Sequence, residues 1–435
     1  MLTPATWIRP ILLLGLLILL GACKKDDPSP IVINNPDPLR LIIDTEKTYQ
    51  NIAGFGGASR MWGTRFLEAE EAQKAFGLGE EELGLSIFRI RIAPNESEWP
   101  NIVEAARDAY NRGVTILASP WSPPANLKSN NSEIGGNLPP ESFEAYKNHL
   151  NRYVQFMADN GIAIHAISLQ NEPDIQVGYE SCDWTSSRMA QFLREYGDQI
   201  SGTRIAAPES FNFDPNFTNN LLNDSEVASK IDIVAGHIYG GGLNPFPLAE
   251  QLNKEIWMTE YLLNLNVGQS GAPGWSTYDE KIKWDESLDM LTSIHEAMEL
   301  NWNAYIWWYL RRYYSFLGDG EQGTTNGEIL KRGYAFSHFS KFIRPGYTRI
   351  DAKINRTNNL LATAYKKDQQ IVAVIINASD EATTNLHLEL DRASSAEAYI
   401  TDQNRNRTPF PTEIQENAVI VDIMPRSVTT LVITL

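Results

Sequence analysis

Cysteine, histidine and positive charge are all scarce in this chain of 435 residues. There are two cysteines and six histidines, and the histidines occur singly, without HxH or HExxH spacing. A metal site in a protein needs ligands clustered at such spacings, and because they are missing the sequence predicts no metal. Acidic residues outnumber basic ones, 54 to 37, and the formal net charge of −17 argues against nucleic acid or an anionic membrane surface as a partner.

The N-terminal segment WIRPILLLGLLILLGAC has a basic residue, Arg9, and then a short apolar run that ends in small residues. The run is too short for a spanning helix and is followed by KKDDPSP, so it predicts a signal peptide over residues 1–22. LGAC resembles the lipobox of bacterial lipoproteins, which implies that Cys23 is lipidated after cleavage. KKDD resembles the tract that Bacteroidetes-type lipoproteins use for surface export. We therefore expect a lipid-anchored protein of the bacterial outer membrane, exposed at the cell surface, with its anchor as its only membrane contact.

Acylation of Cys23 would leave Cys182 without a partner, so no intrachain disulfide is expected and Cys182 is interpreted as structural. Residues 23–38 include a stretch rich in proline, asparagine and aspartate, which predicts a tether ahead of the folded part.

Short apolar, β-branched runs then alternate with amphipathic stretches. The candidate strands are residues 52–58, 86–92, 115–121, 165–172, 204–209, 232–239, 255–260 and 303–309. Helical patterns lie between them, and two of these end at Gly113 and Gly161 as C-cap signals, while a third begins at Thr185 as an N-cap. Eight strands apolar enough to be buried on both faces predict an α/β fold, a (β/α)8 TIM barrel over residues 51–346. An open doubly wound sheet is the alternative, but GFGGAS lacks the GxGxxG spacing of its phosphate turn.

From about residue 347 apolar and polar residues alternate without helical spacing, as in SVTTLVITL. Residues 347–435 are therefore predicted to form an appended antiparallel β-sandwich side domain. The run LRLIIDTEKTYQ, residues 39–50, has the same alternation and is expected to supply N-terminal strands to that sandwich.

Carboxylates and aromatic residues stand where the predicted barrel strands end, and that is where the chemistry of such barrels takes place. Strand 4 ends in Asn171 and Glu172, strand 5 in Glu209 and strand 7 in Glu260. Trp121 ends strand 3, Tyr239 ends strand 6, and Trp308 and Tyr309 end strand 8. Glu172 and Glu260 face each other across the barrel, which is the arrangement glycoside hydrolysis requires. Such chemistry needs no cofactor, so none is expected.

Each of these residues also has a plainer interpretation. A single glutamate could be a solvated rim residue, and Glu209 is more readily interpreted as a rim or supporting carboxylate. His237, in VAGHIY, is more often a core or supporting histidine than a metal ligand. Most of the 11 tryptophans and 17 tyrosines are expected in the core. The pair of glutamates on matching strand ends is the signal that these interpretations do not explain.

The motifs GFGGAS, FRIRI, ASPWSPP, ISLQNEPD, APESF, HIYG, WMTE and YIWWYLRRYY follow in the order seen in glycoside hydrolase family 30. Nearly the whole chain after the tether is similar, and the subfamily it most resembles is subfamily 8, the bacterial glucuronoxylanases. The resemblance implies a retaining endo-acting xylanase whose polysaccharide partner is xylan, and we expect a monomer.

The resemblance also implies roles. Glu172 would be the acid/base and Glu260 the nucleophile, while Asn171 would hold the sugar 2-hydroxyl. Arg89 would lie under the nucleophile and keep its pKa low. The residues implied as further substrate contacts are Trp121, Trp308 and Tyr239 around the cleaved sugar, and Arg312 and Tyr314 at the glucuronic acid branch.

Two features depart from the subfamily pattern. Leu262 stands where a tyrosine is expected after strand 7, and Leu265 follows. The loop FLGDGEQGTTNGE, residues 316–328, is longer and more acidic than expected, and an acidic loop would repel a uronate. Arg311 and Arg312 also have the alternative of a surface ion pair. The open alternatives are a β-1,6-glucanase, a β-xylosidase, a glucosylceramidase-like exo-enzyme, or a non-catalytic carbohydrate-binding lipoprotein.

Overall fold

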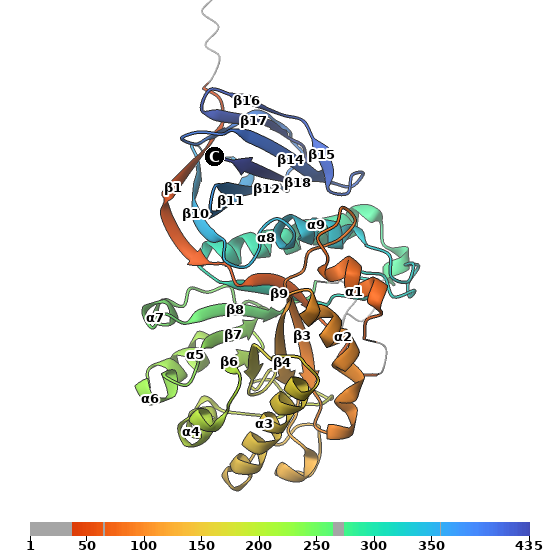
Figure 1. The fold of residues 1–435 in the computed structure, drawn as a ribbon, viewed down its shortest axis with the longest axis vertical. Coiled ribbons are helices and arrows are strands. Elements are labelled where there is room, and N and C mark those ends of the chain that lie inside the picture. Colours follow the sequence, from red (N-terminus) through yellow and green to blue (C-terminus); the bar gives the residue numbers. More distant parts are fainter. Residues whose placement is uncertain (1–36, 64–65, 264–273, 357) are drawn as a thin grey trace, which may run out of the picture. The chain divides into compact units, whose positions relative to one another are not determined.

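The computed structural model describes residues 37–63, 66–263, 274–356 and 358–435. Within them the predicted (β/α)8 barrel is confirmed, because eight parallel strands close on themselves in chain order (Figure 1). The barrel strands are β2 (Gly54–Ala58), β3 (Ile87–Ile92), β4 (Thr115–Pro120), β5 (Ala166–Ser168), β6 (Arg204–Ser210), β7 (Ile233–His237), β8 (Glu255–Glu260) and β9 (Ala304–Tyr309). Each overlaps one of the eight runs expected from the sequence.

Helices lie around the outside of the barrel (Figure 1), and their buried apolar residues share one core with the strands. They are α1 (Ala69–Phe76), α2 (Pro100–Asn111), α3 (Phe143–Asp159), α4 (Ser186–Tyr196), α5 (Pro215–Leu222), α6 (Ser225–Ala228), α7 (Pro247–Gln251), α8 (Glu280–Glu299) and α9 (Lys331–Ser340). The expected cap of α4 is confirmed, since the Thr185 side chain accepts a hydrogen bond from the Arg188 amide. No helix in the described ranges has the length and apolar content needed to cross a bilayer.

The remaining strands form one ten-stranded sheet, called the side sheet below. They are β1 (Arg40–Asn51), β10 (Thr348–Ile354), β11 (Leu360–Lys367), β12 (Gln370–Asn377), β13 (Thr383–Glu389), β14 (Ser395–Thr401), β15 (Thr408–Phe410), β16 (Thr412–Gln415), β17 (Ala418–Ile423) and β18 (Ser427–Thr434). Alternate residues from both halves of the sheet enclose a second apolar core, as a sandwich requires. Its pairing is mostly antiparallel, but β1 and β13 run parallel, which the sequence did not indicate.

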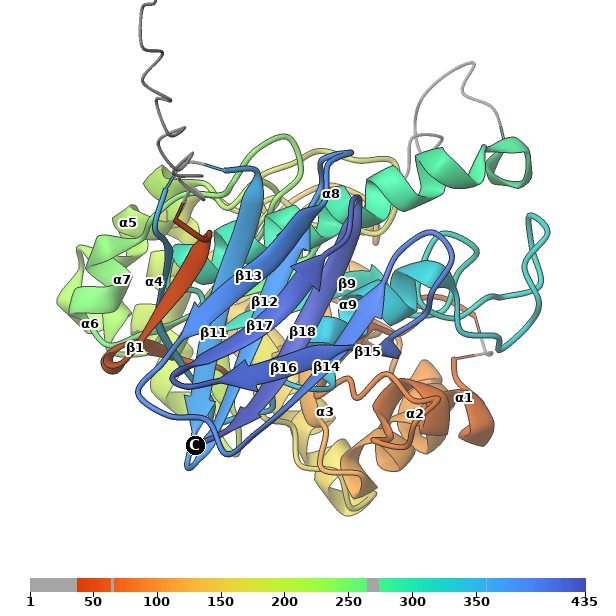
Figure 2. The same ribbon diagram turned by 90° about the horizontal axis from the view of Figure 1, so that it is seen from above.

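The helices α8 and α9 pack on the side sheet as well as on the barrel (Figures 1 and 2). The Trp284 indole of α8 donates to the Arg426 carbonyl at 2.8 Å. His338 of α9 lies between Thr401 and Thr430 of the side sheet, with a ring nitrogen 2.8 Å from each hydroxyl. The barrel and the side sheet are therefore joined by buried polar contacts as well as by apolar packing.

The barrel interior is layered, and this layering positions the site. Side chains alternate along each strand, so residues two apart point the same way. A lower layer is apolar, made from residues such as Ile87, Leu117 and Ala235. Two residues further along the same strands stand Arg89, Ser119 and His237, all buried. The interior thus changes from apolar to ionisable toward the carboxyl ends of the strands.

Candidate active site

Glu260 ends β8 and is 6% exposed, with a hydrogen-bond donor on each carboxylate oxygen. Arg89 of β3 donates from Nη1 to Oε2 at 2.6 Å, and Tyr239, just past β7, donates to Oε1 at 2.9 Å. The three side chains come from three different strands or the residues just after them. Both oxygens of Glu260 are therefore held in a fixed orientation.

Glu172 does not end a strand as expected, because β5 stops at Ser168, four residues earlier. Its backbone has φ of 46°, in the left-handed region that is unfavourable for a residue with a Cβ. The Glu172 amide donates to the Glu209 carbonyl at 3.0 Å, which helps to hold this conformation. Glu172 Oε1 lies 3.0 Å from His237 Nδ1, and Oε2 accepts a hydrogen bond from the Tyr179 hydroxyl at 3.3 Å.

The two glutamates face each other closely. One carboxylate oxygen of Glu172 and one of Glu260 lie within 4.8 Å of each other. Retaining glycosidases have carboxyl groups about 5–5.5 Å apart, whereas inverting enzymes need roughly 6.5–9.5 Å to admit a water molecule. The spacing therefore suits direct attack by one carboxylate on the sugar.

His237 lies within the same distance of both glutamates, so these three residues could in principle surround a metal ion. The chemistry of the cluster favours another use. The guanidinium of Arg89 already supplies a positive charge to Glu260 at 2.6 Å, and Glu172 is already engaged by His237. A divalent cation would have to share this space with a fully buried guanidinium, which electrostatic repulsion disfavours.

Arg89 connects the residues of the site. Its Nη2 donates to Asn171 Oδ1 at 2.6 Å and to Glu209 Oε1 at 3.0 Å, and its Nε donates to Ser119 at 3.2 Å. Asn171 is 3% exposed, and because its carbonyl oxygen accepts from Arg89, its amide nitrogen is the group turned to other partners. Glu209 supports the site from beneath, in agreement with its interpretation as a supporting carboxylate.

The buried charges shift one another's pKa values. Burial opposes ionisation of Glu209, but Arg89, His237 and Ser168 outweigh it and lower the pKa of Glu209 to about 2. Burial likewise disfavours protonated His237, yet Glu260, Glu172 and Glu209 together raise the pKa of His237 to about 9. At neutral pH an ionised Glu209 therefore lies between two cations, Arg89 and protonated His237.

The expectation that Arg89 keeps the pKa of Glu260 low is wrong in its net direction. Burial is the largest influence and raises the pKa of Glu260, and the nearby Glu172 carboxylate also raises it. His237 and Arg89 act in the opposite direction but do not outweigh the burial.

Aromatic side chains wall the site. Trp121, 2% exposed, lies over the guanidinium of Arg89 with its ring centroid 4.8 Å away. Its ring centroid is 5.9 Å from that of Trp308 and 5.9 Å from that of Trp62. The structure thus brings together Trp121, Trp308 and Tyr239, as expected, and adds Trp62, which the sequence analysis did not single out.

Tyr179 is a second residue that the sequence analysis missed. It contacts Glu172, its ring lies 6.3 Å from that of Trp62, and it is 45% exposed. An exposed aromatic beside a buried carboxylate is a surface on which a sugar ring can stack. Its position seven residues after Glu172, in a segment without regular structure, left no periodic signal for sequence analysis.

Arg312 and Tyr314 both have partners within the chain. Arg312 Nη1 lies 2.8 Å from Asp319 and 2.9 Å from Glu321, both in the loop 316–328. Tyr314 is 6% exposed and packs in an aromatic cluster with Trp275 and Tyr278, against which Leu262 also packs. Cys23 and Leu265 lie outside the described residues. Cys182 is buried and burial raises the pKa of its thiol to about 12.

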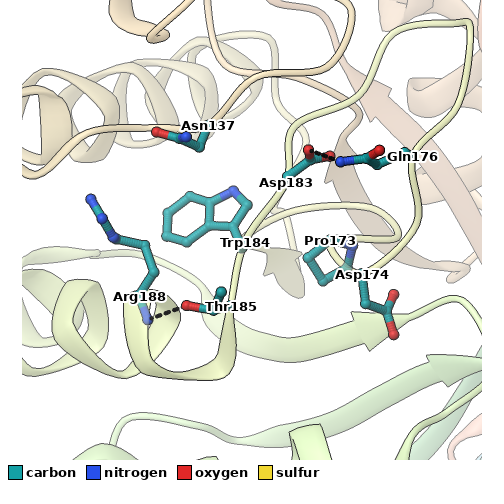
Figure 3. A pocket seen from close by; sticks show the side chains of 8 residues that line it. All are labelled: Asn137, Pro173, Asp174, Gln176, Asp183, Trp184, Thr185 and Arg188. Carbon is teal, nitrogen blue, oxygen red and sulfur yellow. Dashed lines mark hydrogen bonds between the residues drawn. The ribbon is translucent and has the colours of Figure 1, made fainter.

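A pocket of about 310 Å³ begins at Pro173, directly after Glu172 (Figure 3). Its wall combines Trp184 with polar side chains that include Asn137, Gln176 and Arg188. Gln176 donates to Asp183 at 3.1 Å, as drawn in Figure 3. The loops after β4 and β5 and the first turn of α4 supply this pocket, so a polar hollow adjoins the side of the site that carries Glu172.

Residues 80–311 match the model of the glycosyl hydrolase family 30 TIM-barrel domain. The chain is 36% identical over 405 residues to glucuronoxylanase XynC of Bacillus subtilis (strain 168), covering 90% of this chain and 91% of the relative. The chain belongs to glycosyl hydrolase family 30. As a family 30 enzyme it is a retaining glycoside hydrolase, which agrees with the close carboxylate spacing.

Solved structures agree with this family 30 assignment. The family 30 subfamily 8 xylanase Xyn30A from Clostridium acetobutylicum superposes with a TM-score of 0.81 at 30% identity, over 91% of this chain and 100% of that one. A family 30 endoxylanase from Clostridium papyrosolvens C71 superposes with a TM-score of 0.78 at 31% identity, again over 91% and 100%.

Proposed function

We propose that this family 30 enzyme is an endo-acting β-1,4-xylanase that cleaves glucuronoxylan. The observation that carries the proposal is the facing pair of Glu172 and Glu260, with carboxylate oxygens within 4.8 Å and separate hydrogen-bond partners for each. The xylan substrate is supported by the similarity to a glucuronoxylanase and to two xylanase structures.

In the first step, an oxygen of ionised Glu260 forms a bond to the sugar C1 while the bond from C1 to the leaving oxygen breaks. Glu172 gives its proton to that leaving oxygen. Arg89 and Tyr239 donate to the two oxygens of Glu260 and hold them in place for this attack. In the second step Glu172 takes a proton from water, the water oxygen attacks C1, and the bond from C1 to Glu260 breaks.

The residues around the pair bind the sugar in this proposal. Asn171 donates its amide to the 2-hydroxyl, a contact that strengthens in the transition state. Trp121, Trp308 and Tyr239 enclose the sugar ring, because aromatic faces pack on the apolar faces of a sugar. Their support is their common position around Arg89 and Glu260.

Two glutamate variants test the roles. Glu260→Ala should abolish turnover of every substrate, because nothing else reaches C1. Glu172→Ala should spare aryl xylosides with good leaving groups, which need no protonation. The measurement is kcat/KM for both variants on an activated aryl substrate and on xylan. If both variants lost kcat/KM equally on the activated substrate, the assignment of the two roles would be wrong.

Product analysis tests the substrate. Xylo-oligosaccharides of several lengths should be released from glucuronoxylan, and no oligosaccharides from β-1,6-glucan. Release of xylose alone would indicate a β-xylosidase. Activity on β-1,6-glucan or a glucosylceramide, without activity on xylan, would move the enzyme to another specificity within the family.

We further propose that the protein is a monomer anchored to the outer membrane, at the cell surface, by acylated Cys23. The support is the LGAC motif and the tether that follows it. Cys23→Ala should move the protein from the membrane fraction to the soluble fraction. If this variant stays in the membrane fraction, the lipobox interpretation is wrong.

A further inference from the structure

The pocket that begins at Pro173 lies beside the residue that protonates the leaving oxygen in the proposed mechanism. Glu172 gives its proton to that oxygen, so the sugars that depart with the oxygen bind on the Glu172 side of the cleft. We call this the leaving side. The pocket has a volume of about 310 Å³, at the lower end of the range for ligand sites, which suits one sugar unit.

The two loops that form the pocket are tied to each other. The Asp183 amide, in the loop after β5, donates to the Gly136 carbonyl in the loop after β4 at 2.8 Å. Lys128, 4% exposed, also spans the two loops, because its Nζ donates to the Ser181 carbonyl at 2.5 Å. The walls of the pocket are therefore held in place before a ligand binds, which lowers the entropic cost of binding.

The wall presents a hydrogen-bond acceptor and a donor that the chain leaves largely unused. Asp183 Oδ2 accepts from Gln176 at 3.1 Å, but Oδ1 is buried and has no hydrogen-bond partner among the described residues. A buried carboxylate oxygen without a donor is unfavourable, and a ligand hydroxyl can supply that donor. In the described part of the chain the Arg188 guanidinium makes one hydrogen bond, a long one of 3.5 Å from Nη1 to the Leu138 carbonyl.

The chemistry of the lining favours a neutral sugar. The indole of Trp184 lies among the polar side chains (Figure 3) and stacks on Phe143, with ring centroids 6.0 Å apart and planes 7° apart. An aromatic surface beside separate donors and acceptors suits a sugar ring, whose hydroxyls both donate and accept. Asp174 and Asp183 against Arg188 give the lining a formal charge of −1, which disfavours an anionic ligand.

We propose that this pocket is a leaving-side subsite that binds one neutral sugar unit of the substrate, with Asp183 as acceptor and Arg188 as donor. The inference rests on the proposed xylanase function and extends the substrate contacts beyond the cleaved bond. The residues around Glu260 bind the sugar that stays on the enzyme, and this pocket binds a sugar that departs.

The test compares a substrate that has leaving-side sugars with one that has none. Arg188→Gln should lower kcat/KM on glucuronoxylan by about ten-fold, mainly through KM, because a charge-assisted hydrogen bond to the departing sugar is lost. An aryl β-xylobioside releases an aryl group in place of a sugar, so its kcat/KM should change by less than about two-fold. Asp183→Asn, on another part of the wall, should show the same selective loss.

Arg194→Gln is the matched control. Arg194 lies on the same helix, α4, and pairs with Asp224 and Glu226 outside the pocket. The substitution removes the same charge and should leave kcat/KM on both substrates unchanged. Full activity of the Arg188 and Asp183 variants on the aryl xylobioside shows that they are folded.

A second measurement places the pocket on the leaving side. The aryl xylobioside forms the glycosyl-enzyme, and added xylobiose then competes with water. A xylobiose hydroxyl gives its proton to Glu172, its oxygen forms the bond to C1, and the bond from C1 to Glu260 breaks. At a subsaturating xylobiose concentration, Arg188→Gln should lower the ratio of transfer product to hydrolysis product by about ten-fold.

Three outcomes would overturn this inference and leave the xylanase proposal standing. They are unchanged glucuronoxylan kinetics in both pocket variants, equal losses on the two substrates, and a loss on glucuronoxylan with an unchanged transfer ratio. Equal losses would show that the side chains support the loops, and an unchanged transfer ratio would place the sugar away from the cleaved bond. If the wild type hydrolyses the aryl xylobioside but not glucuronoxylan, the proposed function is wrong, and this inference with it.

Discussion

At the scale of single residues, Arg89 shows how a buried charge is retained. Its side chain is fully buried, which is costly for a guanidinium unless ionised partners surround it. Glu260 and Glu209 supply two negative charges, and Asn171 and Ser119 accept from the remaining N–H groups. The planar fork reaches four acceptors from one position, which the single ammonium group of lysine cannot do.

Arg89→Lys should therefore lower kcat/KM by about 100-fold or more, since at least two charge-assisted hydrogen bonds of about 1.5–3 kcal/mol each are lost. Steady-state kinetics on an aryl substrate measures this. Arg91→Lys is a matched control, because Arg91 lies on the same strand and pairs with Glu180 and Glu98 away from the reacting carboxylates. Comparable losses in both variants would show that Arg89 acts through the stability of β3 instead of through the site.

Residues at strand ends could be identified from the sequence, because a strand's last residues lie at the barrel mouth whatever the loops do. This holds for Glu260 and, with a shift of four residues, for Glu172. The state of Arg312 could not be predicted, because it depends on where Asp319 and Glu321 are placed by a folded loop. Tyr179 was missed for the same reason.

At the scale of elements, continuous apolar runs separated by helical stretches led to the prediction of the barrel. Buried runs of five to seven residues such as Gly54–Ala58 and Arg204–Ser210 left a clear apolar pattern. The pattern failed where the backbone changes direction within an apolar stretch. Residues 165–172 continue in apolar and amide residues, but the ladder stops at Ser168 and the chain then reaches Glu172 with a positive φ. The parallel pairing of β1 with β13 is set by long-range packing and has no local signal.

Close approach between β2 and β3 gives a prediction at this scale. A Cβ added at Gly56 would lie 2.2 Å from the Ile87 carbonyl oxygen, which is backbone and cannot move aside. Gly56→Ala should therefore destabilise the protein by about 3 kcal/mol or more, measured by urea unfolding. Gly178→Ala is the control, because a Cβ there meets nothing within 4 Å. Equal stability of the two variants would show that β2 and β3 can separate without cost.

At the scale of the whole molecule, the ionisation of buried histidines ties stability to pH in two opposite ways. Burial lowers the pKa of His338, at the junction with the side sheet, to about 3, and Arg407 adds to the effect. Burial also lowers the pKa of His149 to about 4, against a smaller opposing influence of Glu96. In the barrel interior the carboxylates around His237 reverse this effect and raise its pKa to about 9.

The signs of these shifts predict a stability maximum near neutral pH. His237 gains its partners only when protonated, so its contribution is complete below its unfolded pKa of about 6.5 and is lost as pH rises through 9. That contribution is on the order of 3 kcal/mol. His338 and His149 must stay neutral to remain buried, so stability falls as pH drops from about 6.5 toward 3. The pKa of Glu209 is lowered to about 2, so this residue adds to the loss of stability as the pH falls below about 4.5.

Urea unfolding between pH 4 and pH 9.5 should therefore give a curve that declines on both sides of neutrality. His237→Gln should reduce the decline in stability above neutral pH, because glutamine has no proton to lose. The decline in stability at acid pH should remain. His338→Gln should reduce the acid decline without affecting the alkaline one, since only its own protonation is removed. An alkaline decline that persists in His237→Gln would assign it to another group. The catalytic cluster would then not be the place where alkaline pH acts on the stability of this fold.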